Sequence, residues 1–410
     1  MRRRFLYIDI IAAVIVVGGI AAVAVLALSH GSGPKPTPFP TQQVTPAATP
    51  SPSPSSSPAL LALGNWLTYG YDAARTRFNP AIAVRPPYHI KWRYAAGDLL
   101  EFPPSIYNGY LYLCTEHGLV LCLRASDRHV IWRYKLRHGA LFAATPTVDA
   151  RSVYVTSLGG RFVVLDRLTG TFEWGLSGIG RSESSPLVWR DRVFFGDEDG
   201  SVYAMSISTH KVVWRYHTGG AVKGAPAELN GRIVVGSYDG SLYCLSYNGK
   251  LLWRAGSSGL LSSNQFYATA ALAYDTAYIG GTGDNIYAYS LSNGGLRWSF
   301  ATGGYVYSSP AVWRDLVYEG SYDGYFYALN AATGRLVWKF STGAPISGSP
   351  TVLDGIVYVS NFGHHTWGLN ARTGRVVWRF ADGKYSPATA DSKTLYLNGT
   401  HTLYALVPKH

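Results

Sequence analysis

The sequence predicts an all-β protein, an eight-bladed β-propeller of four-stranded antiparallel blades, and three observations lead to that prediction. Trp recurs near the end of each of eight units at intervals of 39 to 45 residues, which is the period of a propeller blade. Thirty Tyr, 12 Trp and 45 Gly fit aromatic-rich strands joined by tight turns. Hydrophobic residues make up 47% of the chain and charged residues 15%, enough to bury a core. The repeating Trp residues are Trp92, Trp132, Trp174, Trp214, Trp253, Trp298, Trp338 and Trp378.

One unit contains the strands of one blade. In residues 309–340 we expect strands at Ser309–Val312, Leu316–Gly320, Tyr325–Asn330 and Leu336–Phe340. Between the second and third, the sequence Ser-Tyr-Asp-Gly that ends at Gly324 is typical of a hairpin turn with Gly in the left-handed conformation. A β-sandwich also has many short strands, but it does not repeat one motif eight times.

The two ends of the chain are expected to close the ring. The last unit, residues 386–407, supplies three strands and stops before any Trp strand. The first Trp strand, residues 89–95, has no unit before it. Pairing it with the last unit completes an eighth blade and leaves no open blade at the seam.

Two segments precede the repeats. Residues 5–28 are apolar apart from Asp9, and 24 residues exceed the length that crosses the roughly 30 Å hydrocarbon core of a membrane. Three Arg residues come before this stretch, so the positive-inside tendency places residues 1–4 in the cytoplasm and the repeats outside. Residues 29–60 are rich in Pro, Ser and Thr and predict an extended linker to the propeller at 61–410. A cleaved signal peptide is the competing interpretation of the apolar stretch.

Charge and cysteine content limit which partners and which cysteine roles we expect. The net charge is +12, and beyond residue 60 there are 32 basic and 23 acidic residues. This excess suits an anionic cell-envelope polymer or lipid headgroups. It is not gathered into a run that would follow a phosphate backbone, so we expect no nucleic-acid partner. The three Cys residues (Cys114, Cys122 and Cys244) are expected to be buried free thiols.

The hairpin before each repeating Trp carries a recognisable pattern. It reads Ala, then Asp or Asn two residues on, then Thr-Gly, then Trp ten positions after the Ala. A full copy ends at Trp338, and copies with Val164 or Gly368 in place of the Ala end at Trp174 and Trp378. This resembles the tryptophan-docking motif of the PQQ-like (quinoprotein-type) propellers, which include quinoprotein alcohol dehydrogenases and the outer-membrane assembly factor BamB. Residues 65–79 also resemble the W-x-x-Y-G-x-D segment that precedes the ring in those dehydrogenases.

The resemblance has consequences for the site. It implies that each repeating Trp packs between neighbouring blades and has a structural role. In the dehydrogenases of this family the quinone lies on the propeller axis between a Trp and two adjacent disulfide-bonded Cys residues, beside Ca²⁺. This chain has no Cys-Cys pair, and no HExxH, P-loop, CxxC or GxSxG motif. We therefore expect no cofactor, no metal and no catalytic residue, with PQQ and calcium as the alternative. His364 and His365 replace a usual Asp-Gly turn and are interpreted as an altered surface turn.

One position of the repeat differs in charge and size from unit to unit, whereas the positions with a structural role stay uniform. The connection from each outer strand to the next inner strand should bring one residue to the mouth of the axial channel. We expect opposite-charge pairs there between adjacent blades, Glu101 with Lys384 and Glu183 with Lys223. The candidate binding residues are Glu101, Glu183, Lys223, Tyr267, Tyr307 and Lys384, and Ala143 and Ser347 complete the set.

These observations predict a membrane-anchored extracytoplasmic propeller that binds a protein partner or an anionic envelope polymer and is a monomer. A quinone-dependent oxidoreductase with an atypical site and a sensor ectodomain are the alternatives.

Overall fold

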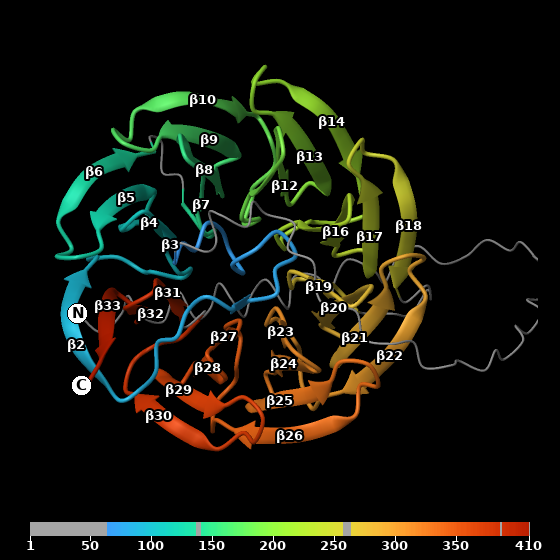
Figure 1. The fold of residues 1–410 in the computed structure, drawn as a ribbon. Coiled ribbons are helices and arrows are strands. Elements are labelled where there is room, and N and C mark those ends of the chain that lie inside the picture. The colour runs from blue at the N-terminus through green and yellow to red at the C-terminus, as the bar shows by residue number, and fades with distance from the viewer. Residues whose placement is uncertain (1–63, 137–140, 257–263, 386–387, 410) are drawn as a thin grey trace, which may run out of the picture. The chain divides into compact units, whose positions relative to one another are not determined.

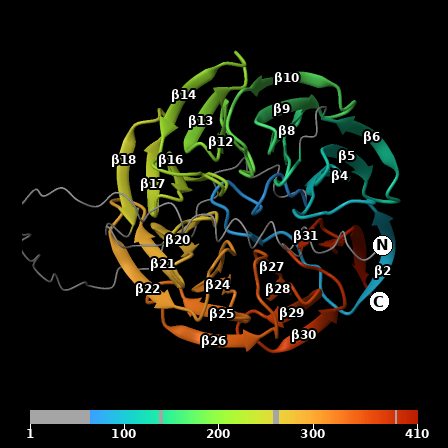
Figure 2. The same cartoon turned by 180° about the vertical axis from the view of Figure 1, so that it is seen from behind.

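The computed structural model describes residues 64–136, 141–256, 264–385 and 388–409, and these form a ring of eight β-sheets around one axis (Figure 1). Among the described residues, seven sheets have four strands and one has a fifth, the short β1 (Phe78–Asn79). The four strands of each blade are antiparallel to their neighbours, whereas β1 pairs with β27 in parallel. The predicted eight-bladed propeller is therefore confirmed. Figure 2 shows the same ring from its opposite face.

The strands are numbered along the chain. The innermost are β3 (Ser105–Tyr107), β7 (Thr147–Val148), β11 (Leu187–Trp189), β15 (Ala227–Leu229), β19 (Ala271–Ala273), β23 (Ala311–Trp313), β27 (Thr351–Leu353) and β31 (Ala388–Ala390). The second strands are β4 (Tyr110–Thr115), β8 (Ser152–Ser157), β12 (Arg192–Gly196), β16 (Arg232–Gly236), β20 (Thr276–Gly281), β24 (Leu316–Gly320), β28 (Ile356–Asn361) and β32 (Leu395–Asn398). The third strands are β5 (Leu119–Arg124), β9 (Arg161–Asp166), β13 (Ser201–Ser206), β17 (Ser241–Ser246), β21 (Asn285–Ser290), β25 (Tyr325–Asn330), β29 (His365–Asn370) and β33 (Thr402–Pro408). The outermost are β6 (Val130–Lys135), β10 (Phe172–Ser177), β14 (Val212–His217), β18 (Leu251–Gly256), β22 (Leu296–Ala301), β26 (Leu336–Ser341), β30 (Val376–Phe380) and β2 (Tyr88–Ala95).

The sixth blade (β23–β26) shows how closely the sequence predicts the strands. The second and third strands have the predicted bounds, and Gly324 adopts a φ of +82° in the hairpin turn. The first strand begins at Ala311 instead of Ser309. The Ser309 N–H donates to the side chain of Ser349 in the next blade, and Pro310 has no N–H to donate, so neither residue adds to the strand ladder.

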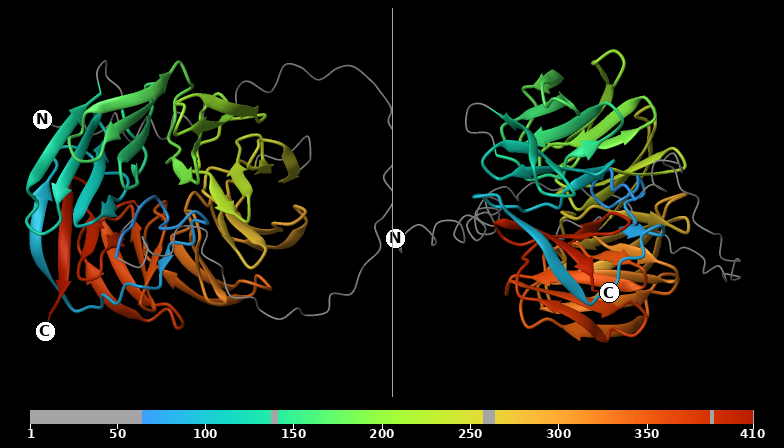
Figure 3. Two further views of the ribbon diagram at one scale, coloured as in Figure 1. Left: turned by 45° about the horizontal axis from the view of Figure 1, so that its top comes forward. Right: turned by 60° about the vertical axis from the view of Figure 1, so that its left-hand side comes forward.

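The ring closes through strands from both ends of the repeats. Strand β2 pairs with β33 from Tyr88 opposite Pro408 to Ala95 opposite Thr402, so the eighth blade is β31, β32, β33 and β2. The oblique views place the blue β2 along the red β33 (Figure 3). This is the predicted closure.

The repeating Trp residues join each blade to the next, as the resemblance implied. Six indole N–H groups donate to a backbone carbonyl of the following blade at 2.9–3.0 Å, counted over the described residues: those of Trp92, Trp132, Trp214, Trp253, Trp298 and Trp338. Trp174 instead stacks on the ring of His210 with centroids 4.5 Å apart. Trp378 meets the ring of Tyr88 edge-on at 5.3 Å across the closing seam.

The segment before the ring crosses its axis, which the sequence did not predict. Residues 66–79 run across the centre of the ring (blue in Figure 1) and bond to the inner strands of successive blades. Backbone N–H groups that donate to this segment belong to Ile106, Val148, Glu228, Leu272, Val312 and Val352. Arg75 is fully buried and donates to the carbonyls of Pro226 and Pro186 at 2.9 and 3.2 Å. We call residues 66–79 the plug.

The predicted membrane anchor at 5–28 and the linker at 29–60 precede residue 64 and lie outside the described residues, as does the tail at 1–4. Within the part of the chain that the structure describes, no helix is long and apolar enough to span a membrane. The three Cys residues are buried and free, as expected.

Candidate functional site

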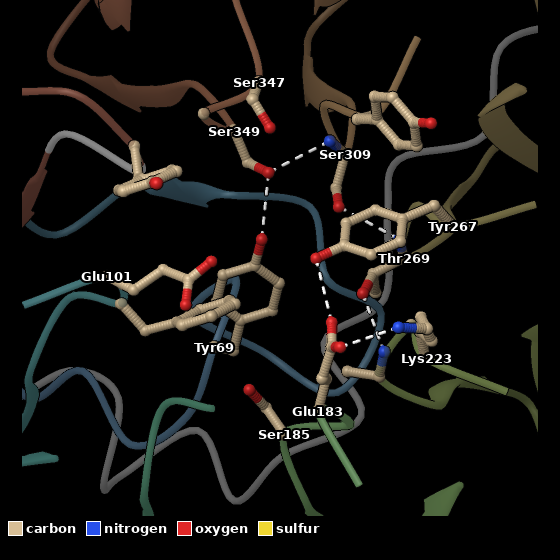
Figure 4. Close-up of a pocket in the computed structure, with 16 residues that line it drawn as sticks. Tyr69, Glu101, Glu183, Ser185, Lys223, Tyr267, Thr269, Ser309, Ser347 and Ser349 are labelled. Atoms are coloured by element: carbon tan, nitrogen blue, oxygen red, sulfur yellow. Dashed lines mark hydrogen bonds and ion pairs between the residues drawn. The ribbon is translucent and has the colours of Figure 1, made fainter. Parts of the chain in front are cut away.

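The axial channel forms a well whose lining includes Tyr69 of the plug (Figure 4). Five of the six candidate binding residues line it: Glu101, Glu183, Lys223, Tyr267 and Tyr307. Ser347 lines it as well. Lys384 and Ala143 are not among the lining residues, and Ala143 is buried.

The fold explains why these positions meet. Each lies four residues before an inner strand, as Lys223 lies before β15 and Tyr267 before β19. The inner strands surround the axis, so the same position in successive blades faces the same opening. The eightfold repeat therefore brings together side chains that are about 40 residues apart in sequence.

A charged network occupies one side of the mouth. The Lys223 ammonium lies 2.7 Å from a Glu183 oxygen and 3.1 Å from a Glu198 oxygen. The Tyr267 hydroxyl donates to the other Glu183 oxygen at 3.1 Å. The predicted pair between Glu183 and Lys223 is therefore present. Glu198, which lies in the hairpin turn of the third blade, was not predicted.

Burial and charge act against each other in this network. Burial raises the pKa of Glu183, and the nearby Lys223 only partly offsets this effect. Burial alone would lower the pKa of Lys223, but the two carboxylates raise it above its ordinary value. The ammonium is thus held in its charged form by two carboxylates in a largely enclosed place.

The second predicted pair does not form. Glu101 and Lys384 are both described by the structure, and no ion pair joins them. The Lys384 ammonium lies 5.5 Å from the ring centroid of Phe362 and 5.3 Å from that of Tyr385, which is cation–π distance. Burial, followed by the charges of Glu183 and Glu116, raises the pKa of Glu101 to about 8. At neutral pH a largely protonated Glu101 gives Lys384 little charge to pair with.

Aromatic rings occupy the other side of the mouth. Tyr267 contacts Tyr307 with centroids 5.2 Å apart, and Tyr307 contacts Tyr322 at 5.0 Å. The series continues from Tyr322 to Phe362 at 5.6 Å and from Phe362 to Tyr385 at 5.8 Å. We call the set the aromatic arc, and it consists of Tyr238, Tyr267, Tyr305, Tyr307, Tyr322, Phe362 and Tyr385. Only Tyr267 and Tyr307 were predicted. Tyr238, Tyr322 and Phe362 occupy the same hairpin-turn position in three blades, a signal that the sequence did contain.

A belt of hydroxyl groups lies below the mouth. Backbone N–H groups of Thr145, Ala225, Thr269 and Ser309 donate to a Ser or Thr side chain of the next blade at 2.8–3.0 Å. The Tyr69 hydroxyl lies 2.9 Å from Ser349 Oγ, which ties the plug to this belt. These Ser and Thr residues recur two positions after the mouth position, so the repeat pattern could have revealed them. The belt joins blades and gives the well polar walls.

Other polar groups behave as ordinary surface. The side chains of His364 and His365 bond to Thr400 Oγ1 at 3.0 Å and to the Gly363 carbonyl at 2.7 Å, which agrees with a surface turn. Asp98, Glu116 and His117 lie close enough to share a metal ion. Asp98 already accepts the His117 backbone N–H at 2.8 Å and lies 2.6 Å from its ring.

The fold and this site define a class, that of closed eight-bladed propellers with an axial well. The chain belongs to the PQQ-like repeat family described as outer membrane protein assembly factor BamB, which matches residues 89–209, 177–305 and 301–408.

The chain is similar to curated relatives that include an alcohol dehydrogenase and an outer-membrane assembly factor. Quinohemoprotein alcohol dehydrogenase ADH IIB of Pseudomonas putida is 25% identical over 58% of this chain and 39% of its own length. BamB of Kangiella koreensis is 30% identical over 29% of this chain and 30% of its own length. The chain thus spans well under half the length of either relative.

Solved structures show the same fold. BamB from Moraxella catarrhalis has a TM-score of 0.66 at 17% identity and covers 78% of this chain and 99% of its own. A europium-containing methanol dehydrogenase has a TM-score of 0.71 at 13% identity, over 86% and 100% of the two chains. At such identities the likeness describes the fold alone.

Proposed function

We propose that this chain is a non-catalytic binding propeller, anchored in a cell membrane with the ring outside the cytoplasm, and that it binds a protein partner at the mouth of its well. One observation carries the proposal. The mouth gathers the aromatic arc and the Lys223 network at positions that vary between blades, whereas the docking positions repeat. Tyr is one of the residue types enriched at the positions that contribute most to protein recognition, and charged groups at an interface contribute specificity.

The side chains present bear on the quinone-dependent alternative. The resemblance implies a Trp and an adjacent Cys pair on the axis, yet neither Trp nor Cys occurs among the described residues that line the well. The repeating Trp residues lie on the outer strands and join one blade to the next. The three Cys residues, Cys114, Cys122 and Cys244, are buried free thiols. The space in the well is about 40 Å³, which holds only a few waters. These residues do not fit the cofactor.

Membrane placement is supported by the apolar stretch at 5–28, the Arg residues before it and the Pro-rich linker. A labelling experiment tests it. Phe172 is 56% exposed on an outer strand, and the native thiols are buried, so background labelling should be low. A Phe172→Cys variant should react with a membrane-impermeant maleimide in intact spheroplasts. Labelling that requires lysis would place the ring in the cytoplasm.

Photo-crosslinking tests the binding function. A photoreactive phenylalanine is placed at Tyr305, the most exposed member of the aromatic arc at 40%, and in a second variant at Phe172 as the matched control. The full chain is expressed in its own cells and irradiated. We expect a discrete protease-sensitive adduct from position 305 that is absent from position 172. The same adducts from both positions, or none from 305, would contradict the proposal. An adduct that resists protease and yields to polysaccharide-degrading enzymes would identify an envelope polymer instead.

A further inference from the structure

The mouth contains two lysines of the chain itself, and they show how it holds an ammonium group. Lys223 is bound by the carboxylates of Glu183 and Glu198, and its Nζ lies 5.7 Å from the ring centroid of Tyr238. The Lys384 ammonium lies over two rings of the aromatic arc. Carboxylates and ring faces are the two groups that stabilise an alkylammonium in a partly desolvated place.

Glu101 offers a third place in the mouth where an ammonium group could bind, and no described lysine of the chain itself is bound there. Its carboxyl points into the well beside Tyr69 (Figure 4). No hydrogen bond or ion pair joins it to another described residue, whereas Glu183 is bonded to both Lys223 and Tyr267. Glu101 as a residue keeps part of its surface exposed, and it lines the well.

The shape of the well limits what can enter. A space of about 40 Å³ favours a small or slender group. Tyr69, Tyr267 and Tyr307 provide apolar surface for methylene groups around it. A lysine side chain has four methylenes and a compact ammonium, whereas the planar guanidinium of arginine is wider.

We propose that the well receives a lysine side chain of the partner, with its methylenes against the tyrosines and its ammonium on Glu101. This proposal rests on the proposed function, because it names the group by which the partner enters the mouth. It assigns to Glu101 a direct contact with the ligand.

The protonation of Glu101 makes the contact depend on pH. Burial, with Glu183 and Glu116, raises the Glu101 pKa to about 8, while Lys223 and Lys384 act in the opposite direction. The free carboxyl therefore carries a proton at pH 7, and an ammonium ligand prefers the deprotonated form. Binding should release a proton, and affinity should rise with pH up to about 8, approaching tenfold per pH unit below that value. The ligand ammonium stays charged over this range because its own pKa is about 10.4.

Calorimetry on the full chain in mild detergent tests the proposal. The probe is an acetylated and amidated Gly-Gly-Lys-Gly-Gly peptide, and the comparison peptides carry Arg or Gln in place of Lys. We expect the Lys peptide to bind at pH 8.5 and to bind at least about tenfold more weakly at pH 6.5. Glu101→Gln, which matches the protonated carboxyl in shape, should weaken binding at pH 8.5 by about tenfold or more. Glu173→Gln, at an exposed carboxylate of β10, should bind as the unchanged chain does.

Several results would overturn the inference. The inference is wrong if the Lys peptide does not bind, if the Gln peptide binds equally well, or if the Arg peptide binds as tightly or more tightly. It is also wrong if a neutral disaccharide binds at the same site, or if Glu101→Gln leaves the affinity for the Lys peptide unchanged. A urea midpoint for Glu101→Gln at pH 6.5 that is no lower than that of the unchanged chain shows that the variant is folded. If the peptide fails while the adduct from position 305 forms, only the lysine proposal is wrong. If both fail, the binding function fails with it.

Discussion

Replacing Gly334 by Ala perturbs the docking of one blade on the next. Gly334 has a φ of +69°, and a Cβ built on it would lie 2.7 Å from ring atoms of Trp298. An L-residue in the left-handed conformation costs about 1–2 kcal/mol. Forcing an extra carbon into a filled contact costs about 1–3 kcal/mol more. We therefore expect Gly334→Ala to lower the free energy of unfolding by about 2–5 kcal/mol.

Gly343 provides the matched control. Its φ is +79°, and a Cβ there would meet nothing within 4 Å. Gly343→Ala should cost only the conformational part, about 1–2 kcal/mol. Urea unfolding followed by Trp fluorescence gives both values for the full chain in detergent. Equal losses in the two variants would refute the interpretation that each hairpin Gly provides the surface on which the preceding Trp packs.

Three further predictions follow from closure, charge and the well. Deleting residues 64–96 removes the plug and β2, so the remaining ring should melt at a lower temperature and less cooperatively, and an unchanged melting curve would contradict the closure. Because the Glu101 pKa is raised to about 8 in the folded chain, this group stabilises the fold below its unfolded pKa and loses that contribution as pH rises through 8. The urea midpoint of Glu101→Gln should therefore fall less between pH 5 and 9 than that of the unchanged chain. PQQ with Ca²⁺ should not bind stoichiometrically in equilibrium dialysis, and saturable binding that requires Ca²⁺ would restore the quinone-dependent alternative.

The blades were predictable because their determinants are local and repeated. The Trp interval sets the period, and turns such as the one that ends at Gly324 set the strand ends within a few residues. Closure by β2 followed from counting, since the first Trp strand and the last unit each lacked a partner. The start of β23 was missed because Ser309 bonds across to Ser349, a contact between blades that one unit cannot reveal.

The site was predictable only in part. The position that reaches the mouth follows from the repeat, and it correctly brought Glu183 and Lys223 together. The contacts that a side chain makes at the mouth depend on its neighbours from other blades. The sequence therefore predicted the wrong partner for Lys384. The plug was missed because a charged loop with residues such as Arg75 ordinarily predicts solvent exposure. The buried guanidinium donates to the carbonyls of Pro226 and Pro186, which directly precede β15 and β11, and to two acceptors of the plug itself. These acceptors offset the cost of burying its charge, and they come together only once the ring has formed.

The central claim is that this propeller binds a partner through the mouth of its well, and a comparison of dissociation constants tests it most directly. The partner captured through position 305 is titrated against the purified full chain and two double variants. Tyr307→Ala with Tyr322→Ala removes two rings of the aromatic arc. Leu336→Ala with Val337→Ala removes side chains that are 44% and 49% exposed on an outer strand. For the variant that lacks the two rings, the account predicts a Kd at least about tenfold higher, as expected for the loss of an aromatic anchor. For the variant on the outer strand, it predicts a Kd within about twofold of that of the unchanged chain. Equal effects of the two double variants, or a loss confined to the outer strand, would contradict it.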